Sequence, residues 1–182
     1  MYYNYNFGKI NEHGSLERFR GIPGLFNPSA DRVEAYAAEH GFKPLEDNPA
    51  PNQYYTSEWV DNGEKITRVN TPMDLEQVKN MAREMVQENL NRELKLRTEV
   101  DCEDLGKAII YDEAALINAM GLEAGDAFIT ADDSVIILTE TQKNAVKAAL
   151  KTYRAGLYAA ATEKRAQINA CSSVDDVAQI AF

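Results

Sequence analysis

The chain has 182 residues, of which 45% are hydrophobic, enough for one domain or two small ones with a packed core. It carries 19 basic against 29 acidic residues, a formal net charge of -10. Because nucleic-acid binding rests on a basic surface that displaces counterions, this balance argues against a nucleic-acid partner. No apolar run approaches the roughly 20 residues that cross a bilayer, and no signal peptide is visible. We therefore expect a soluble protein without membrane insertion.

The first 28 residues are rich in Tyr, Asn, Gly and Phe. The run Tyr2–Phe7 interleaves aromatic residues with asparagine, which favours a strand because aromatic side chains suit a pleated surface. The alternative is a recognition surface for a sugar or a protein, since Tyr and Asn combine contact area with hydrogen bonding. Gly21–Gly24 predicts a loop. A helix is then expected to begin at Asn27 or Ser29 and to end at Gly41.

Residues 43–53 contain three prolines and are predicted to form an irregular, extended connector. Two β-rich runs follow, residues 54–60 and 65–69, on either side of an Asn-Gly pair. Such a pair between two such runs is a strong hairpin signal. The lone tryptophan, Trp59, precedes the turn and is expected to anchor the packing of this small sheet.

A long helix is predicted from residue 73 to about Arg97. Thr71 is a suitable N-cap, Pro72 suits the first helical position, and Asp74 complements the positive end of the helix dipole. About 25 residues of helix would span nearly 40 Å at 1.5 Å per residue, which is long for so small a protein. The helix is therefore interpreted as a connector between two units.

The C-terminal part is predicted to hold a second hairpin and a second long helix. In chain order the elements before that helix are an acidic loop, a short strand, a helix capped by Asp112, and the hairpin: residues 101–106, 107–111, 112–120 and 128–138. Thr139 and Gln142 fit a capping box at the start of the long helix. Ser172 or Ser173 is expected to cap a last helical turn.

The long helix carries an apolar stripe at a spacing of four, three and four residues. Its members, together with an apolar residue near the end of the helix, form a candidate packing or oligomer seam: Val146, Leu150, Tyr153, Leu157 and Ile168. The spacing is typical of a heptad seam, and also of a helix that packs on a sheet. The stripe is therefore either an intramolecular core or an interface between copies of the chain.

Residues that carry chemistry are sparse. The two histidines, His13 and His40, and the two cysteines, Cys102 and Cys171, form no triad or metal-ligand spacing. Two free thiols are expected, the alternative being one long-range disulfide. No glycine-rich phosphate loop is present. We therefore predict no enzymatic activity, no cofactor, and no catalytic or metal residue.

One acidic cluster has no ready structural role. It consists of Asp101, Glu103 and Asp104 in the predicted acidic loop. Carboxylates are the ligands that calcium prefers, and paired carboxylates also serve as acid and base. A weak metal site, or a small carboxylate-dependent or metal-dependent enzyme, is therefore the alternative to a non-enzymatic chain.

The C-terminal block resembles a domain of unknown function that recurs in phage tail-fibre-associated and prophage tail proteins. The resemblance rests on Leu122–Phe128, on the long Ala-rich helix ending at Ala170, and on Ser173–Val177. The layout of the first half is similar to that of short tail-fibre accessory or assembly proteins. Cys171-Ser172 and the aromatic N-terminus depart from the pattern. The family has no catalytic motif to carry over.

We therefore expect an α+β fold in which small β-hairpins are each followed by a long helix. The expected parts are a helix and hairpin in residues 1–72, a connecting helix in residues 73–100, and a hairpin with a long helix in residues 101–182. The resemblance implies a structural or accessory virion component of a phage or prophage tail, made in the bacterial cytoplasm. It would self-associate as a homo-oligomer and dock to other tail proteins. The alternative is a tail-fibre assembly chaperone that is absent from the virion.

Overall fold

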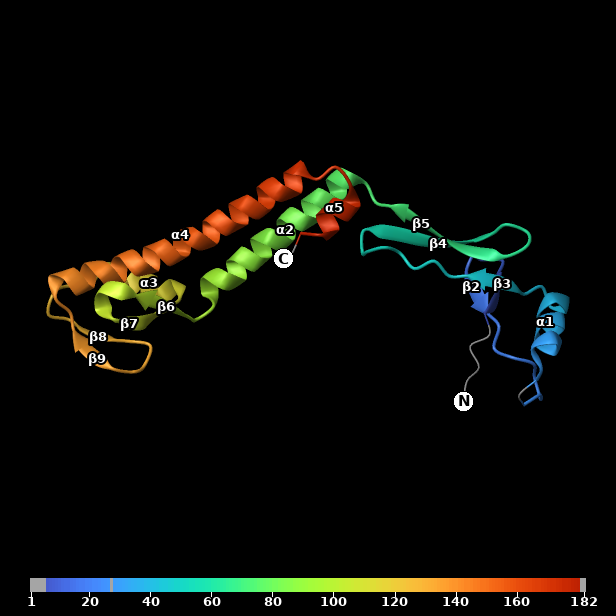
Figure 1. The fold of residues 1–182 in the computed structure, drawn as a ribbon, viewed down its shortest axis with the longest axis horizontal. Helices are drawn as coiled ribbons and strands as arrows, with labels where there is room; N and C mark the ends of the chain where they lie inside the picture. The colour runs from blue at the N-terminus through green and yellow to red at the C-terminus, as the bar shows by residue number, and fades with distance from the viewer. Residues whose placement is uncertain (1–5, 27, 181–182) are drawn as a thin grey trace. The chain divides into compact units, whose positions relative to one another are not determined.

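The structure is a computed structural model that describes residues 6–26 and 28–180. It combines helices with small sheets, which confirms the predicted α+β class (Figure 1). The chain divides into two compact units, Met1–Leu75 and Glu76–Phe182. Most of the predicted strand Tyr2–Phe7 and the Asn27 cap lie outside the described residues. No helix in the described part is long and apolar enough to cross a membrane.

The first unit is built on a sheet with the strand order β2-β1-β3-β5-β4. Its elements are β1 Phe7–Ile10, β2 Leu16–Arg18, α1 Ala30–Glu39, β3 Lys43–Glu46, β4 Tyr55–Asp61 and β5 Ile66–Pro72. Strands β3 and β5 pair in parallel, and the other neighbours are antiparallel. The β4–β5 hairpin turns at Gly63, where a φ of 96° requires a residue without a side chain. This is the hairpin that the Asn-Gly pair predicts.

Aromatic contacts hold α1 on this unit. Phe19 is buried, and its ring centroid lies 6.4 Å from that of Phe7, 5.3 Å from that of Phe42 and 6.2 Å from that of Tyr36 on α1. Trp59 is only half-buried and stacks under the guanidinium of Arg18. The aromatic core of the unit is therefore centred on Phe19 rather than on its tryptophan.

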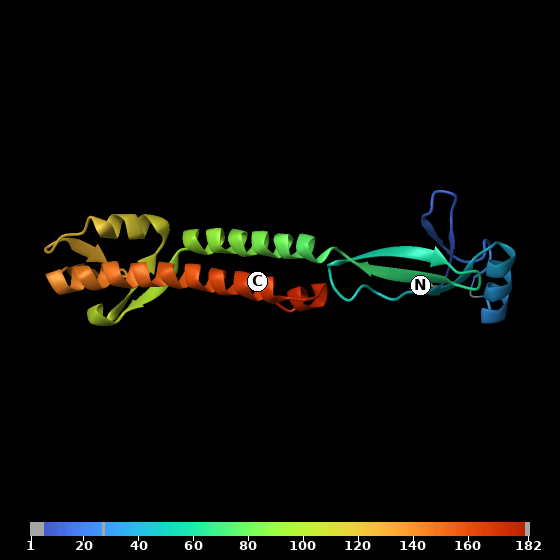
Figure 2. The same ribbon diagram turned by 90° about the horizontal axis from the view of Figure 1, so that it is seen from above.

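The second unit has one long helix as its spine, α4 Glu140–Ala170, which is about 46 Å long at 1.5 Å per residue. Helix α2 Leu75–Lys95 lies beside the second half of α4 (Figures 1 and 2). Packed along the first half of α4 are β6 Thr98–Cys102, η1 Glu103–Leu105 and α3 Glu113–Met120. The remaining elements are β7 Lys107–Tyr111, β8 Ala127–Ile129, β9 Val135–Ile137 and α5 Val174–Ala178.

Three predicted caps of the second unit are confirmed. Thr139 and Gln142 form the capping box of α4. The Asp112 carboxylate accepts from the main-chain N of Ala115 at 2.6 Å and so caps α3. Ser173, rather than Ser172, occupies the N-cap of α5. Short side chains at these positions satisfy main-chain donors that the first turn of a helix leaves free.

Several boundaries in the first unit differ from the sequence expectation. Residues 43–46 form β3 although the segment was expected to be irregular. Pro44 lacks a donor, but one missing N–H does not prevent Leu45 from pairing with Ile66 and burying its side chain. Strand β2 was not predicted.

The start of the long helix is also different. Thr71 and Pro72 are the last residues of β5, where Pro72 pairs with Tyr55, so neither starts α2. The helix begins at Leu75 and ends at Lys95, and the unpredicted strand β6 follows it. Helix α2 belongs to the second unit rather than forming a separate connector, because its apolar face is buried there: Val78, Ala82, Val86, Leu90 and Leu94.

Candidate functional site

The predicted seam on α4 lies largely in the core of its own unit. Val146 and Leu150 are fully buried in a cluster with Ile109, Tyr111 and Leu138. Tyr153 and Leu157 are half-buried against the same cluster, and Ile168 is buried nearer the end of α4. Of the two alternatives for this stripe, the structure therefore has the intramolecular one.

The outer face of the β8–β9 hairpin is an exposed apolar surface of the second unit. Ile129, Val135 and Ile137 are 62%, 65% and 64% exposed. Cross-strand pairing places Ile129 opposite Val135 and Ala127 opposite Ile137, so the four side chains share one face. We name these four residues the hairpin face. The alternate residues Phe128 and Ile136 point the other way, into the core.

An apolar outer face is unusual for a two-stranded sheet. A strand with one solvated face normally alternates apolar and polar residues, whereas β8 and β9 are apolar throughout. The sequence indicates this apolar outer face, because successive residues of a strand point to opposite faces and both arms are apolar at every position. Exposed apolar patches of this kind mark contact sites for other molecules. The sequence does not indicate which residues form the hairpin face, because the strand register decides which of two adjacent apolar side chains turns outward.

The tip of the hairpin is fixed by a polar network. The Asp132 carboxylate accepts from Lys107 Nζ at 2.6 Å, from the Thr130 hydroxyl, and from the Ser134 main-chain N at 3.3 Å. These donors, Lys107 first, hold the pKa of Asp132 well below its usual range. Ala131 N also donates to Ala108 O of β7 at 2.9 Å. The hairpin is thus tied to the body of the unit and presents its outer face on a fixed support.

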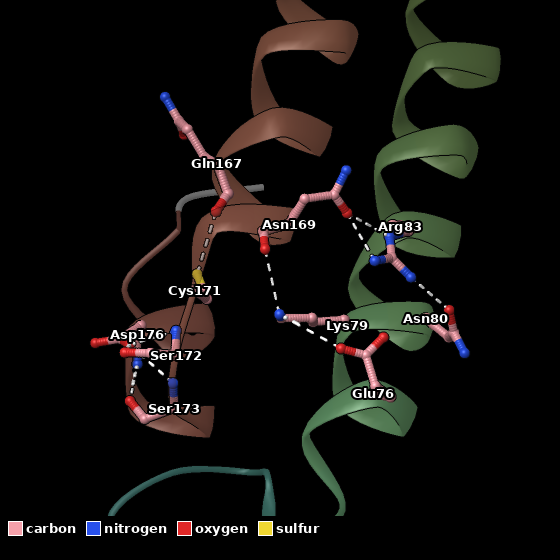
Figure 3. Close-up of polar contacts among 10 residues, drawn as sticks. All are labelled: Glu76, Lys79, Asn80, Arg83, Gln167, Asn169, Cys171, Ser172, Ser173 and Asp176. Atoms are coloured by element: carbon pink, nitrogen blue, oxygen red, sulfur yellow. Dashed lines mark hydrogen bonds and ion pairs between the residues drawn. The ribbon is translucent and has the colours of Figure 1, made fainter.

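A second polar network joins the C-terminal end of α4 to α2 and α5 (Figure 3). Lys79 Nζ donates to Asn169 O at 3.2 Å, and Arg83 donates to Asn169 Oδ1 from Nε at 2.9 Å and from Nη2 at 2.6 Å. Cationic side chains are stabilising at this end of a helix, where unpaired carbonyls concentrate negative charge. Asp176 Oδ2 accepts from Ser172 N and Ser173 N at 3.0 and 2.9 Å. The Lys79 and Asp176 contacts are explained by helix capping, and the Arg83 contact joins side chains of α2 and α4.

The acidic cluster of Asp101, Glu103 and Asp104 does not converge on one point. Asp101 lies in β6, and the other two lie in η1 beside α4. Within the described residues, no group of three or more His, Cys, Asp or Glu side chains could hold a metal ion. The three residues line a shallow hollow of about 440 Å³ whose other wall is the alanine-rich side of α4.

Histidines and cysteines also have structural surroundings. His40 lies at the C-cap of α1, where its ring stacks on Tyr36 at 3.9 Å and its Nδ1 lies 2.9 Å from Tyr36 O. Cys102 is buried and Cys171 half-buried, and both are free thiols. Burial raises the pKa of each thiol, which favours the unreactive protonated form.

Comparisons with known proteins add no functional information to these observations. No protein-family model, no curated protein and no solved structure matches the chain. The geometry of the second unit therefore carries the functional argument.

Proposed function

We propose that the protein is a non-enzymatic structural or accessory component that acts by self-association and by docking to another protein. The observation that supports this role is the hairpin face, whose three large members are each more than 60% exposed on a rigidly tied support. Fully burying an Ile or Val side chain is worth about 1.5–3 kcal/mol, so covering this face would contribute substantially to an interface.

The family resemblance of the C-terminal block suggests the setting. We propose a phage or prophage tail, in which the chain associates with other tail proteins. A tail-fibre accessory protein needs stable elements and contact surfaces but no reaction centre. The polar networks at the hairpin tip and at the C-terminal end of α4 stabilise the elements, and the hairpin face is a contact surface. A tail-fibre assembly chaperone would need the same surface only while the fibre forms.

Two measurements test this proposal. Multi-angle light scattering should find an oligomer for the natural chain and a smaller species for a chain with Ile129→Lys and Val135→Lys. The matched control is Glu84→Lys with Glu88→Lys on exposed positions of α2, which should leave the oligomer intact. A natural chain that stays monomeric and binds no tail particle would contradict the proposal.

The second measurement is mass spectrometry of tail particles purified from bacteria that produce the protein with the phage. Presence of the chain in the particles, and its loss in the double variant of the hairpin face, would support a virion component. Association with the fibre in the cell but absence from finished particles would point to the chaperone. Absence from both would reject the tail setting.

A further inference from the structure

Helix α4 contains a stretch whose charged side chains are all positive, in contrast to the acidic chain as a whole. Between Glu140 and Glu163 it carries no carboxylate side chain, although the whole chain has a net charge of -10. The same stretch carries cations spaced four, four and three residues apart: Lys143, Lys147, Lys151 and Arg154. Residues three and four apart lie on the same side of a helix, so these cations form one stripe.

The first two cations of the stripe have partners in their own chain. Lys143 Nζ lies 2.8 Å from the Glu140 carboxylate, and Lys147 Nζ donates to the Leu122 main-chain oxygen at 2.9 Å. Among the described residues, no ion pair or hydrogen bond joins Lys151 or Arg154 to a carboxylate. The positive charge of the second half of the stripe is therefore not compensated locally.

Arg154 is held in place by its surroundings. Its guanidinium carbon lies 5.6 Å from the ring centroid of Tyr158, one helical turn away. Its Nε is buried and has no hydrogen-bond partner in the described structure. A guanidinium that is stacked on an aromatic ring is well oriented to receive a carboxylate on its outer nitrogens.

The unpaired cations border a groove between α3 and α4. The groove has a volume of about 390 Å³ and is lined by Leu116, Met120, Lys151, Arg154, Ala155 and Tyr158. Met120 and Tyr158 are both more than 40% exposed. Apolar walls beside two unpaired cations make a surface that suits an anionic group attached to an apolar one. The hairpin face contributes no residue to it.

We propose that this groove binds an acidic segment of a partner polypeptide. One or two carboxylates of that segment would pair with Lys151 and Arg154, and an apolar side chain would lie between Met120 and Tyr158. Charge complementarity favours this occupant, because Lys151 and Arg154 lie beside one apolar groove without a carboxylate partner among the described residues. A nucleic acid would be repelled by the overall charge of -10 and would not use the apolar walls. The inference rests on the proposed docking role but concerns a different surface.

The test uses fluorescein-labelled short peptides composed of Glu, Leu, Phe and Ala, with charge-reversed copies in which Lys replaces every Glu. One pair of peptides has the apolar residues at helical spacing and the other has them in alternation. Fluorescence anisotropy should show that the full chain binds an acidic peptide and not its Lys copy, with weaker binding as salt increases. Lys151→Glu with Arg154→Glu should weaken binding about tenfold or more.

The matched control is Arg20→Glu with Arg32→Glu, two exposed positions of the first unit that change the net charge by the same amount. It should bind the acidic peptide as the natural chain does. Lys151→Gln with Arg154→Gln, which is a milder change to α4, should also lose binding while keeping the natural helix content. Tyr158→Ser should weaken binding without removing its salt dependence.

Four results would overturn the inference. The first is that neither acidic peptide binds, and the second is that acidic and Lys peptides bind equally. The third is that Lys151→Glu with Arg154→Glu and the control Arg20→Glu with Arg32→Glu weaken binding equally. The fourth is that the chain binds anionic phosphatidylglycerol vesicles through Lys151 and Arg154 in place of peptides. Failure here is separable from failure of the proposed function. The Ile129→Lys, Val135→Lys chain should still bind the acidic peptide, and the stripe variants should still self-associate.

Discussion

Lys79 on α2 donates a hydrogen bond from Nζ to the main-chain oxygen of Asn169 in the last turn of α4, at 3.2 Å. Lys79 is only 8% exposed, and its other close partner, Glu76, is 3.4 Å away on its own helix. A buried lysine needs a partner to compensate for lost hydration, and a helix C-terminus needs donors for its carbonyls. Each group thus meets the requirement of the other, which fixes the position of α2 along α4.

Replacing Lys79 by Met should therefore destabilise the second unit although it retains most of the apolar stem. We expect a loss of about 1–3 kcal/mol, because the Asn169 carbonyl in the last turn of α4 loses its charged donor. Urea unfolding followed by circular dichroism at the helix band measures it. Lys95→Met, an exposed position on the same helix, should change stability by less than about 0.5 kcal/mol. Equal effects of the two variants would show that the contact with Asn169 contributes nothing.

A substitution at Leu150 tests the packing of the apolar stripe of α4. It is 1% exposed and lies among Ile109, Tyr111 and Val146. Leu150→Asp places a carboxylate in that core without a partner, so the unit should lose several kcal/mol or fail to fold. Circular dichroism and light scattering together distinguish a lost fold from a lost oligomer.

The control for Leu150 is Ala159→Asp, which introduces the same carboxylate at an exposed position of the same helix. It should cost no more than about 1 kcal/mol, the difference in helix propensity. If Leu150→Asp also left both melting and oligomer size unchanged, its assignment to the core would be wrong.

Local signals in the sequence predict most elements of the second unit, with strand β6 and the start of α2 as the exceptions. The capping residues Asp112 and Thr139 and the spacing of Val146 and Leu150 depend only on neighbours within one or two turns, so they can be recognised in one dimension. The same signals do not say which face an element turns outward. Ile129 and Ile136 are equally apolar, and only the register of β8 against β9 decides that Ile129 is exposed.

Long-range pairing accounts for most of the missed elements. Strand β3 forms because Leu45 pairs with Ile66 across 21 positions and overrides the three prolines nearby. Thr71 and Pro72 fit a helix start locally, yet they pair with Thr56 and Tyr55 of β4 and extend the sheet. The sequence likewise does not indicate that Lys151 and Arg154 lack a carboxylate partner among the described residues, because this depends on which carboxylates the fold brings near them.

Asp132 predicts a pH dependence of stability. Its pKa is lowered in the folded state by Lys107 first, then by Thr130 and Ser134. A depressed folded pKa stabilises the fold above the unfolded pKa of about 3.9, and this contribution is lost as the pH falls below that value. The melting-temperature difference between the natural chain and Asp132→Asn should therefore be constant from pH 7 to about 5 and shrink from about pH 4 downward.

Asp133→Asn in the same turn is the control for Asp132. Asp133 has a φ of 60°, a conformation that Asn also tolerates, and no donor bonds to its carboxylate in the described structure. Its difference from the natural chain should not follow the same acid profile. A pH-independent difference for Asp132→Asn would mean that the turn geometry, not the charge, is what stabilises the hairpin tip.

Because Gly8 lies in β1, we expect a substitution there to change the stability of the first unit and not that of the second. A Cβ at this position would lie 2.8 Å from Leu16 Cδ1, 2.8 Å from Leu45 Cδ2 and 3.2 Å from the Glu17 main-chain oxygen. The leucine tips can rotate, but the carbonyl belongs to the neighbouring strand β2. Gly8→Ala should therefore destabilise the first unit by roughly 1–3 kcal/mol, the usual range for overpacking.

The lone tryptophan makes this measurable. Trp59 lies in β4, so its fluorescence follows unfolding of the first unit, whereas circular dichroism at the helix band follows mainly α2 and α4. Gly8→Ala should shift the fluorescence transition and leave the helix transition in place. Gly156→Ala in α4, where an added Cβ meets no atom within 4 Å, should instead raise the helix transition by about 0.5–1 kcal/mol. If Gly8→Ala moved both transitions together, the two units would unfold as one, and their separate cores would not act independently.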